Sequence, residues 1–140
     1  SVMTEEAELI LNPKTARELV DLVFRQVVEI GTGRQALIPG YTLAGKTGTA
    51  QKFDPELRAY NNSRHVVSFV GFVPADRPLF SMVVVIDEPR GPLHYGGQVA
   101  APVFREIARR VLLYMNQPPQ KLPDNLLVAR KETMDTGVTD

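Results

Sequence analysis

Cysteine is absent from this 140-residue sequence, and histidine occurs only twice, as His65 and His94. The absence of cysteine excludes disulfide bonds, thiolate nucleophiles and zinc sites built on cysteine. Two histidines do not favour a metal site that would use several of them. The sequence therefore predicts a protein without a metal or other cofactor.

An excess of charge of either sign is also missing, because 16 Lys and Arg residues balance 16 Asp and Glu residues. A net charge of zero gives no electrostatic attraction for nucleic acid or an anionic membrane, so we expect no nucleic-acid partner. No apolar run approaches the roughly 18 residues of a membrane span. The first eleven residues contain three Glu and are unlike a signal peptide. The 44% of hydrophobic residues is ordinary for one globular domain.

A helix is predicted to begin at Asn12 and Pro13, since asparagine caps a first turn and proline fits the first helical position. Gly31 is typical of a helix end. Between them, apolar residues recur at steps of three and four, which predicts one helix face directed to a core. That face consists of Ala16, Leu19, Val20, Val23, Phe24, Val27 and Val28.

Three segments rich in apolar and β-branched residues predict strands at residues 41–49, 65–73 and 79–87. The segment 53–64 is polar and contains Asp-Pro and Asn-Asn, which predicts a loop. Both connections are too short for the helix of a parallel crossover, so we expect an antiparallel meander. Residues 82–86 are apolar on both faces, as in a strand covered from both sides.

A second helix is predicted over residues 98–115, and residues 117–140 are expected to form a mobile polar tail. The expected fold class is α+β, an antiparallel sheet flanked by helices within residues 1–116. A sheet of three strands has open edges, so we expect the chain to belong to a larger sheet. The predicted apolar stripe of the second helix consists of Val103, Ile107, Val111 and either Phe104 or Leu112.

Residues 44–51 have the sequence Ala-Gly-Lys-Thr-Gly-Thr-Ala-Gln, and two chemistries fit it. Lys-Thr-Gly occurs in serine acyltransferases that recognise penicillin. Residues 40–47 also fit the G-x-x-x-x-G-K-[ST] pattern of a phosphate-binding loop, and residues 83–88 resemble its apolar strand with an acidic end. That loop needs a helix directly after the lysine, which Gly48 and Pro55 prevent, and a parallel sheet. The surrounding sequence therefore favours the first chemistry and leaves a nucleotide-binding protein as a remote alternative.

Side chains alternate along a strand, so Lys46 and Gly48 are expected to point to one side, and Thr47 and Thr49 to the other. Lys46 would bring an ammonium group to a cleft. Gly48 would leave space for the backbone of a substrate. Gln51 fits a cleft position and an ordinary exposed position equally well.

Together with its neighbours, this motif resembles the C-terminal part of the transpeptidase domain of class B penicillin-binding proteins, of the division or elongation type. The resemblance extends over residues 12–116 and keeps the family's order. The blocks that carry it are residues 28–33, 46–51, 67–75, 85–89 and 95–104.

The resemblance implies a five-stranded antiparallel sheet and a serine, within Ser-x-x-Lys, that attacks a peptidoglycan stem peptide. The resulting acyl-enzyme is resolved by a second stem peptide, and β-lactams acylate the same serine. Lys46 would supply positive charge to the proton relay and attract the substrate carboxylate. The Thr49 hydroxyl would bind that carboxylate, and the Thr49 backbone N–H would be an oxyanion donor. Thr47, Gly48 and Gln51 complete the expected substrate-binding set.

The family pattern also implies a place outside the cytoplasm, at the bacterial inner membrane, with an anchor outside this chain and a membrane glycosyltransferase as partner. This chain lacks the nucleophile, because none of its serines has a lysine three residues later and no Ser-x-Asn is present. We therefore expect it to be inactive alone and to need the N-terminal part of the same protein. Three alternatives stay open: a fragment of a β-lactam sensor, a fragment of a β-lactamase of the same fold, and a non-catalytic interaction module.

Four further features have structural interpretations. Thr47 is expected to pack in the sheet, and His65 to begin a strand without a catalytic role. The Asp87-Glu88 pair is expected to form a turn at a strand end rather than a metal site. The segment 95–97, Tyr-Gly-Gly, is expected to shape the start of the last helix.

Overall fold

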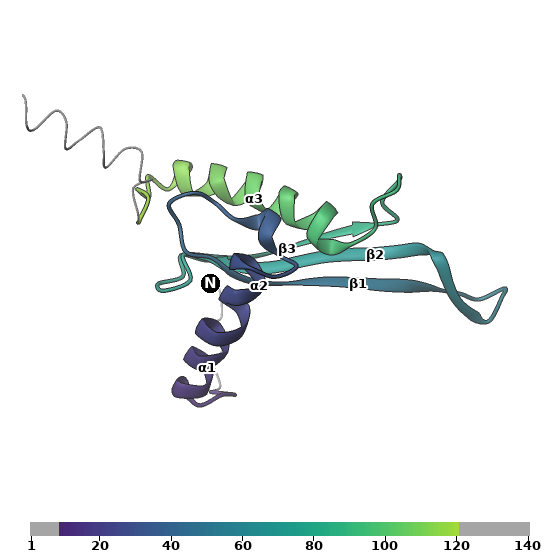
Figure 1. Cartoon of the computed structure of the whole chain (residues 1–140), viewed down its shortest axis with the longest axis horizontal. Coiled ribbons are helices and arrows are strands. Elements are labelled where there is room, and N and C mark those ends of the chain that lie inside the picture. Colours follow the sequence, from purple (N-terminus) through teal and green to yellow (C-terminus); the bar gives the residue numbers. More distant parts are fainter. Residues whose placement is uncertain (1–8, 121–140) are drawn as a thin grey trace, which may run out of the picture.

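The computed structural model describes residues 9–120, which form one three-stranded sheet with helices at its start and across one face (Figure 1). This arrangement confirms the predicted α+β class. In chain order the elements are α1 (Pro13–Leu19), the π-helical turn η1 (Val20–Phe24), α2 (Arg25–Glu29), the 3-10 turn η2 (Arg34–Ala36), β1 (Ala44–Asp54), β2 (Ala59–Val73), β3 (Phe80–Asp87) and α3 (Gly96–Tyr114).

The predicted first helix is present as the consecutive segments α1, η1 and α2. The Asn12 side chain accepts a hydrogen bond from the Lys14 N–H at 2.8 Å, and Pro13 occupies the first helical position, as predicted. The helix ends at Glu29, where the Gly31 N–H donates to the Gln26 carbonyl oxygen at 3.0 Å.

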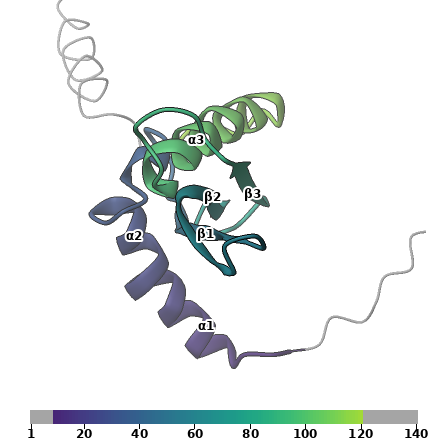
Figure 2. The ribbon, with the colours of Figure 1, turned by 90° about the vertical axis from the view of Figure 1, so that its right-hand side faces the viewer.

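The predicted apolar face of this helix is only partly in the core. Val28 is fully buried, Val23 is exposed, and the other five residues of that face are half-buried. The reason is that the helix projects away from the sheet and meets β1 mainly through α2 (Figures 1 and 2).

The sheet has the order β1-β2-β3 with antiparallel neighbours, which confirms the predicted meander. Lys46 pairs with Val70, which pairs with Val83 on β3. Thr47 pairs with Phe69 in the next row, on the opposite face of the sheet. β1 is therefore an outer strand among the described residues, with the Lys-Thr-Gly motif along its length.

The polar segment 53–64 is not simply a loop, because β1 runs to Asp54 and β2 begins at Ala59. A four-residue turn joins them, and the Asp54 carboxylate accepts hydrogen bonds from the Glu56 and Leu57 N–H groups at 3.0 and 3.2 Å. This long hairpin extends beyond the rest of the sheet (Figure 1). Since both of its faces are open to solvent there, its strands lack the apolar alternation by which strands are recognised.

α3 packs across one face of the sheet with only part of the predicted stripe, because Phe104 and Leu112 are buried whereas Val103 and Ile107 are not. The side chains of Val103 and Ile107 are 40% and 41% exposed. The buried face instead carries small residues around one aromatic and one leucine: Gly96, Gly97, Ala100, Ala101, Phe104, Ala108 and Leu112. The Phe104 ring meets the Phe69 ring of β2 edge to face, with centroids 4.8 Å apart. Alanines allow the helix backbone to lie close to the sheet, so the larger Val and Ile side chains point outward.

The second face of the sheet is only partly covered within residues 9–120. Val84 of β3 is 8% exposed on the α3 side, whereas Val83 and Val85 on the other side are 60% and 59% exposed. The predicted covering of β3 from both sides is therefore not present among the described residues. α1 and η1 lie over only one end of this open face, beside Phe72, around a groove of about 790 Å³.

The segment that follows α3 returns to the loop before β1. The Tyr41 hydroxyl donates to the Gln117 carbonyl oxygen at 2.7 Å, and the Gln120 side-chain oxygen accepts from the Thr42 N–H at 3.0 Å. Residues 117–120, which the sequence assigned to a mobile tail, are thus held against the domain. The rest of that tail lies outside the described residues.

Candidate active site

The Lys-Thr-Gly motif lies on β1 with alternating side chains, as the sequence predicts. Thr47 and Thr49 are opposite Phe69 and Val67, on the face that α3 covers. Lys46 and Gly48 belong to the other face. The threonine hydroxyls and the lysine side chain therefore project from opposite faces of the sheet.

The Thr47 hydroxyl is engaged within the structure. Its Oγ1 lies 2.9 Å from the Oγ1 of Thr32, in the loop after α2, and one of the two hydroxyls donates to the other. Gly97 packs against the same loop, because a Cβ at that position would collide with the Thr32 carbonyl oxygen. Sequence reasoning missed Thr32, since nothing in the spacing of residues 32 and 47 predicts their contact.

The Thr49 hydroxyl contacts the start of α3. Its Oγ1 accepts a hydrogen bond of 3.1 Å from the Gly96 N–H. A Cβ at Gly96 would collide with the carbonyl oxygens of Gly48 and Ser68, so glycine is required for this approach. α3 begins at Gly96 with Tyr95 as its N-cap residue, which fits the expected role of residues 95–97 in shaping the helix start.

Gly48 faces Ser68 across the ladder. The Ser68 hydroxyl occupies the space that a Cβ at Gly48 would need. Because glycine has no side chain, residue 48 itself does not cover the β1 backbone at this position.

Lys46 and the two threonines line one groove of about 860 Å³, although their side chains belong to opposite faces. This is possible because β1 is the outer strand and the groove runs along it. The Lys46 Nζ donates to the Thr47 carbonyl oxygen at 2.9 Å. Arg34 and Arg105 add two more cations, and no carboxylate is among the described residues that line the groove. Three cationic side chains and several hydroxyls suit an anionic group such as a carboxylate.

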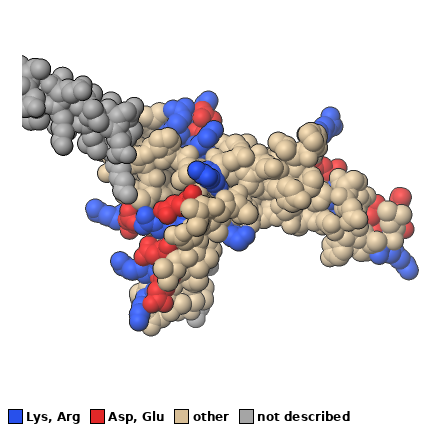
Figure 3. Space-filling view, viewed as in Figure 1, with Lys and Arg blue, Asp and Glu red and all other residues tan. Residues whose placement is uncertain are grey.

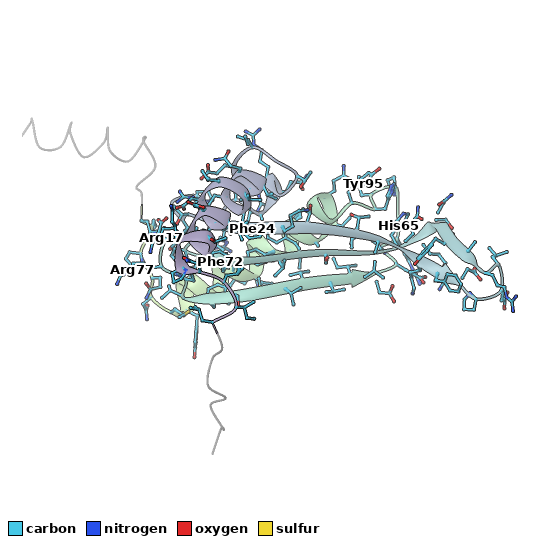
Figure 4. The ribbon with its side chains drawn as sticks, turned by 90° about the horizontal axis from the view of Figure 1, so that it is seen from below. Arg17, Phe24, His65, Phe72, Arg77 and Tyr95 are labelled. Carbon is cyan, nitrogen blue, oxygen red and sulfur yellow. The ribbon has the colours of Figure 1, made fainter. Side chains whose placement is uncertain are left out.

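A second groove of about 680 Å³ adjoins the first and shares Thr49 and Tyr95 with it. Gln51 lines this second groove, where its amide donates to the Asn62 side-chain oxygen at 2.9 Å. His65 stacks on His94 with ring centroids 4.8 Å apart, and His94 packs on Tyr95 at 4.4 Å. His65 and Tyr95 thus lie at the same end of the sheet, opposite to Phe72 (Figure 4).

The Asp87-Glu88 pair forms part of an ionic cluster at the end of the sheet. Lys52 on β1 contacts both carboxylates, at 3.0 Å to Asp87 and 2.7 Å to Glu88, and Arg64 on β2 also pairs with Glu88. Hydrogen bonds from Lys52 and Arg64 hold the pKa of Glu88 below its ordinary value. The hydrogen bonds to Glu88 and Asp87 raise the pKa of Lys52 in turn. Within residues 9–120, no group of three or more metal-ligating side chains is placed to hold a metal ion.

The described part of the chain contains no helix that is long and apolar enough to cross a membrane. On the face drawn in Figure 3, charged side chains gather on the first helix, over α3 and at the hairpin tip.

Comparison with known proteins identifies the family. Residues 3–109 match the penicillin binding protein transpeptidase domain. Stage V sporulation protein D of Bacillus subtilis is 40% identical over 112 residues, which cover 80% of this chain and 17% of the relative. Peptidoglycan D,D-transpeptidase FtsI of Escherichia coli K12 is 38% identical over 115 residues, 82% of this chain and 19% of the relative.

A solved structure gives the same result for the fold. The transpeptidase domain of Burkholderia pseudomallei penicillin-binding protein 3, in its apo form, superimposes with a TM-score of 0.71 at 39% identity. The match covers 80% of this chain and 33% of that one, so the chain spans about a fifth of its curated relatives and a third of the solved domain. The chain belongs to the penicillin-binding protein transpeptidase family, and it forms part of a transpeptidase domain.

Proposed function

We propose that this chain supplies one wall of the active site of a peptidoglycan D,D-transpeptidase, and that the nucleophilic serine comes from the N-terminal part of the same protein. The observation that carries the proposal is the cationic groove along an outer strand, with Lys46, Thr47 and Thr49 in its lining. A stem peptide that ends in D-alanine presents a carboxylate and an extended backbone, which match this groove and this strand.

In the proposed reaction, the serine hydroxyl attacks the penultimate D-Ala carbonyl, the terminal D-Ala leaves, and an acyl-enzyme forms. The amine of a second stem peptide then attacks the ester, and the cross-link is released with the serine regenerated. Lys46 attracts the substrate carboxylate and supports proton transfer at the serine. The Thr49 backbone N–H is one of two oxyanion donors, and each such donor contributes about 10²–10³ in rate.

Thr47, Gly48 and Gln51 belong to the proposed substrate-binding set with different roles. Because Thr47 is tied to Thr32, its contribution is to hold the strand as well as to line the groove. Gly48 leaves the strand backbone accessible, so that substrate pairs with β1 as an added strand. Gln51 lines the adjoining groove, where the stem peptide continues.

The open face of the sheet supports the need for a second part of the protein. Lys46 lies in a row with Val70 and Val83, whose exposed fractions are 49% and 60%. An apolar face with a lysine at its edge suits the segment that carries Ser-x-x-Lys. We further propose a β-lactam as inhibitor, a membrane glycosyltransferase as partner, and a place on the extracytoplasmic face of the inner membrane.

The test is labelling with fluorescent penicillin of the intact polypeptide that contains this chain, followed by a denaturing gel. We expect a covalent label on the polypeptide. Lys46→Ala should lower the acylation rate by about 10- to 150-fold, the range that a hydrogen bond to a charged group supports. Lys14→Ala, which removes an exposed cation from α1, is the matched control and should leave the rate unchanged. Absence of label from the folded wild-type polypeptide would contradict the proposal.

A further inference from the structure

The Thr49 hydroxyl keeps its proton for a further hydrogen-bond partner. A hydroxyl has one proton to donate and two lone pairs to accept with. Thr49 accepts from the Gly96 N–H at 3.1 Å, which leaves its proton for another partner. Thr47 shares a hydrogen bond with Thr32, and this contact uses one of the two protons of the pair.

The Gly96 N–H is held in place by the way α3 meets the sheet. Any side chain at Gly96 would collide with the carbonyl oxygens of Gly48 and Ser68, so the first turn rests directly on the strand backbones. Further along the helix, Ala100 and Phe104 are fully buried against the sheet. The helix therefore cannot withdraw its first amide from Thr49 without disturbing its own packing.

The direction of the remaining Thr49 proton follows from this contact. One side of the oxygen faces the Gly96 amide, and Thr49 also lines the groove that Lys46, Arg34 and Arg105 make cationic. A hydroxyl that accepts a hydrogen bond is a better donor, because hydrogen bonds in a chain polarise one another.

We propose that Gly96 is a positioning residue: its backbone N–H fixes the Thr49 hydroxyl as a hydrogen-bond donor directed at the carboxylate of the ligand in the groove. The inference rests on the proposed function and adds a role for the first turn of α3. Gly96 itself touches no reacting atom.

The experiment removes the N–H without adding a side chain. Glycolic acid replaces Gly96 in the intact polypeptide, which converts one amide to an ester. Acylation rates are measured with penicillin G, which has a free carboxylate, and with its methyl ester. We expect the rate with penicillin G to fall by about 2- to 12-fold, the effect of one ordinary hydrogen bond, and the rate with the methyl ester to stay unchanged.

Three comparisons separate positioning from a merely structural role. Thr49→Val should lower the penicillin G rate by about 10- to 150-fold with little effect on the methyl ester, while Thr49→Ser keeps most of the rate. The same ester replacement at Gly91, in an exposed loop, is the matched control for backbone chemistry. Thr15→Val, at an exposed position of α1 outside the groove, should not discriminate between the two ligands.

The outcomes are distinguishable. Equal losses with both ligands at Gly96, or no loss while Thr49→Val is impaired, would overturn the positioning role and leave the proposed function standing. A wild-type polypeptide that penicillin never acylates would overturn both.

Discussion

At the scale of single residues, Gly48 meets two separate demands for a missing side chain. Within the sheet, the Ser68 hydroxyl fills the space of its absent Cβ. Along the outer strand, the proposed substrate must approach the same backbone. The first demand concerns stability and the second concerns activity, so mutations can separate them.

Gly48→Ala should force the Ser68 hydroxyl into a poorer rotamer, at a cost of about 0.5–1.5 kcal/mol in the free energy of unfolding. Adding Ser68→Ala removes that hydroxyl and should restore stability. The rate of penicillin acylation should stay low in the double variant, because the new methyl group still faces the substrate. Urea unfolding and acylation of the intact polypeptide measure the two effects. Recovery of both quantities in the double variant would show that Gly48 serves packing alone.

At the scale of elements, most helices and strands could be predicted because their apolar residues recur at the spacing that one buried face requires. The antiparallel order followed from the short connections between residues 41 and 87. The hairpin extension around Asp54 could not be predicted, because its strands have no buried face and rely on backbone pairing. The buried face of α3 was predicted only at Phe104 or Leu112. Its alanines were missed because the pattern of bulky residues includes Val103 and Ile107, although close approach to a sheet favours small residues.

Only the part of the candidate site that lies on a single strand could be predicted from the sequence. Lys46, Gly48 and Thr49 share β1, so their spacing alone predicts how their side chains alternate. The contacts of Thr32 with Thr47 and of Gly96 with Thr49 join segments 15 and 47 residues apart. Such contacts depend on how whole elements pack, and no local pattern encodes them.

Packing of α3 on the sheet depends on Phe104. Its side chain is fully buried against the Phe69 ring, so Phe104→Ala should lower the free energy of unfolding by about 3–5 kcal/mol. Tyr114→Ala, at an 88% exposed position of the same helix, should change stability by less than about 0.5 kcal/mol. Urea denaturation of the intact polypeptide compares them, and similar losses for both would contradict the observed orientation of α3.

The ionic cluster of Lys52, Arg64, Asp87 and Glu88 joins all three strands and should make stability depend on pH. Because the folded pKa of Glu88 lies below its ordinary 4.5, the contribution of its carboxylate is complete above that value. It is lost as the pH falls through the lower folded pKa. The difference in melting temperature between wild type and Glu88→Gln should therefore shrink from pH 7 to pH 3.

Salt provides a second check on this cluster, since its side chains are partly exposed and screened by ions. The Glu88→Gln effect at pH 7 should also decrease in about 1 M salt. Glu56→Gln, in the exposed hairpin turn, is the matched control and should show neither dependence. A Glu88 effect that is constant with pH would exclude the carboxylate as its source.

At the scale of the whole molecule, residues 9–120 form a sheet with one covered face and one open face. Val70, Val83 and Val85 leave an apolar surface on the open side, and β1 and β3 are both outer strands. Unpaired strand edges beside exposed apolar surface promote association between chains. The isolated 140-residue chain should therefore aggregate or unfold without cooperativity.

Val83→Lys combined with Val85→Lys should reduce this aggregation, because charge on an open strand opposes pairing between copies. Leu22→Lys with Val23→Lys adds the same charge on the first helix and should help less. Light scattering and thermal melting of the isolated chain provide the comparison. A monomeric, cooperative melt of the unmodified chain would contradict the expectation.

The hydrogen bonds of Gln117 and Gln120 to the loop before β1 have a mechanical consequence. Whatever is fused to the chain after residue 120 is tethered at Thr42, four positions before Lys46 in the sequence. Tension applied at that end would reach the motif strand directly, without first passing along α3. A load or a bulky tag there would act on the strand that lines the proposed active-site groove.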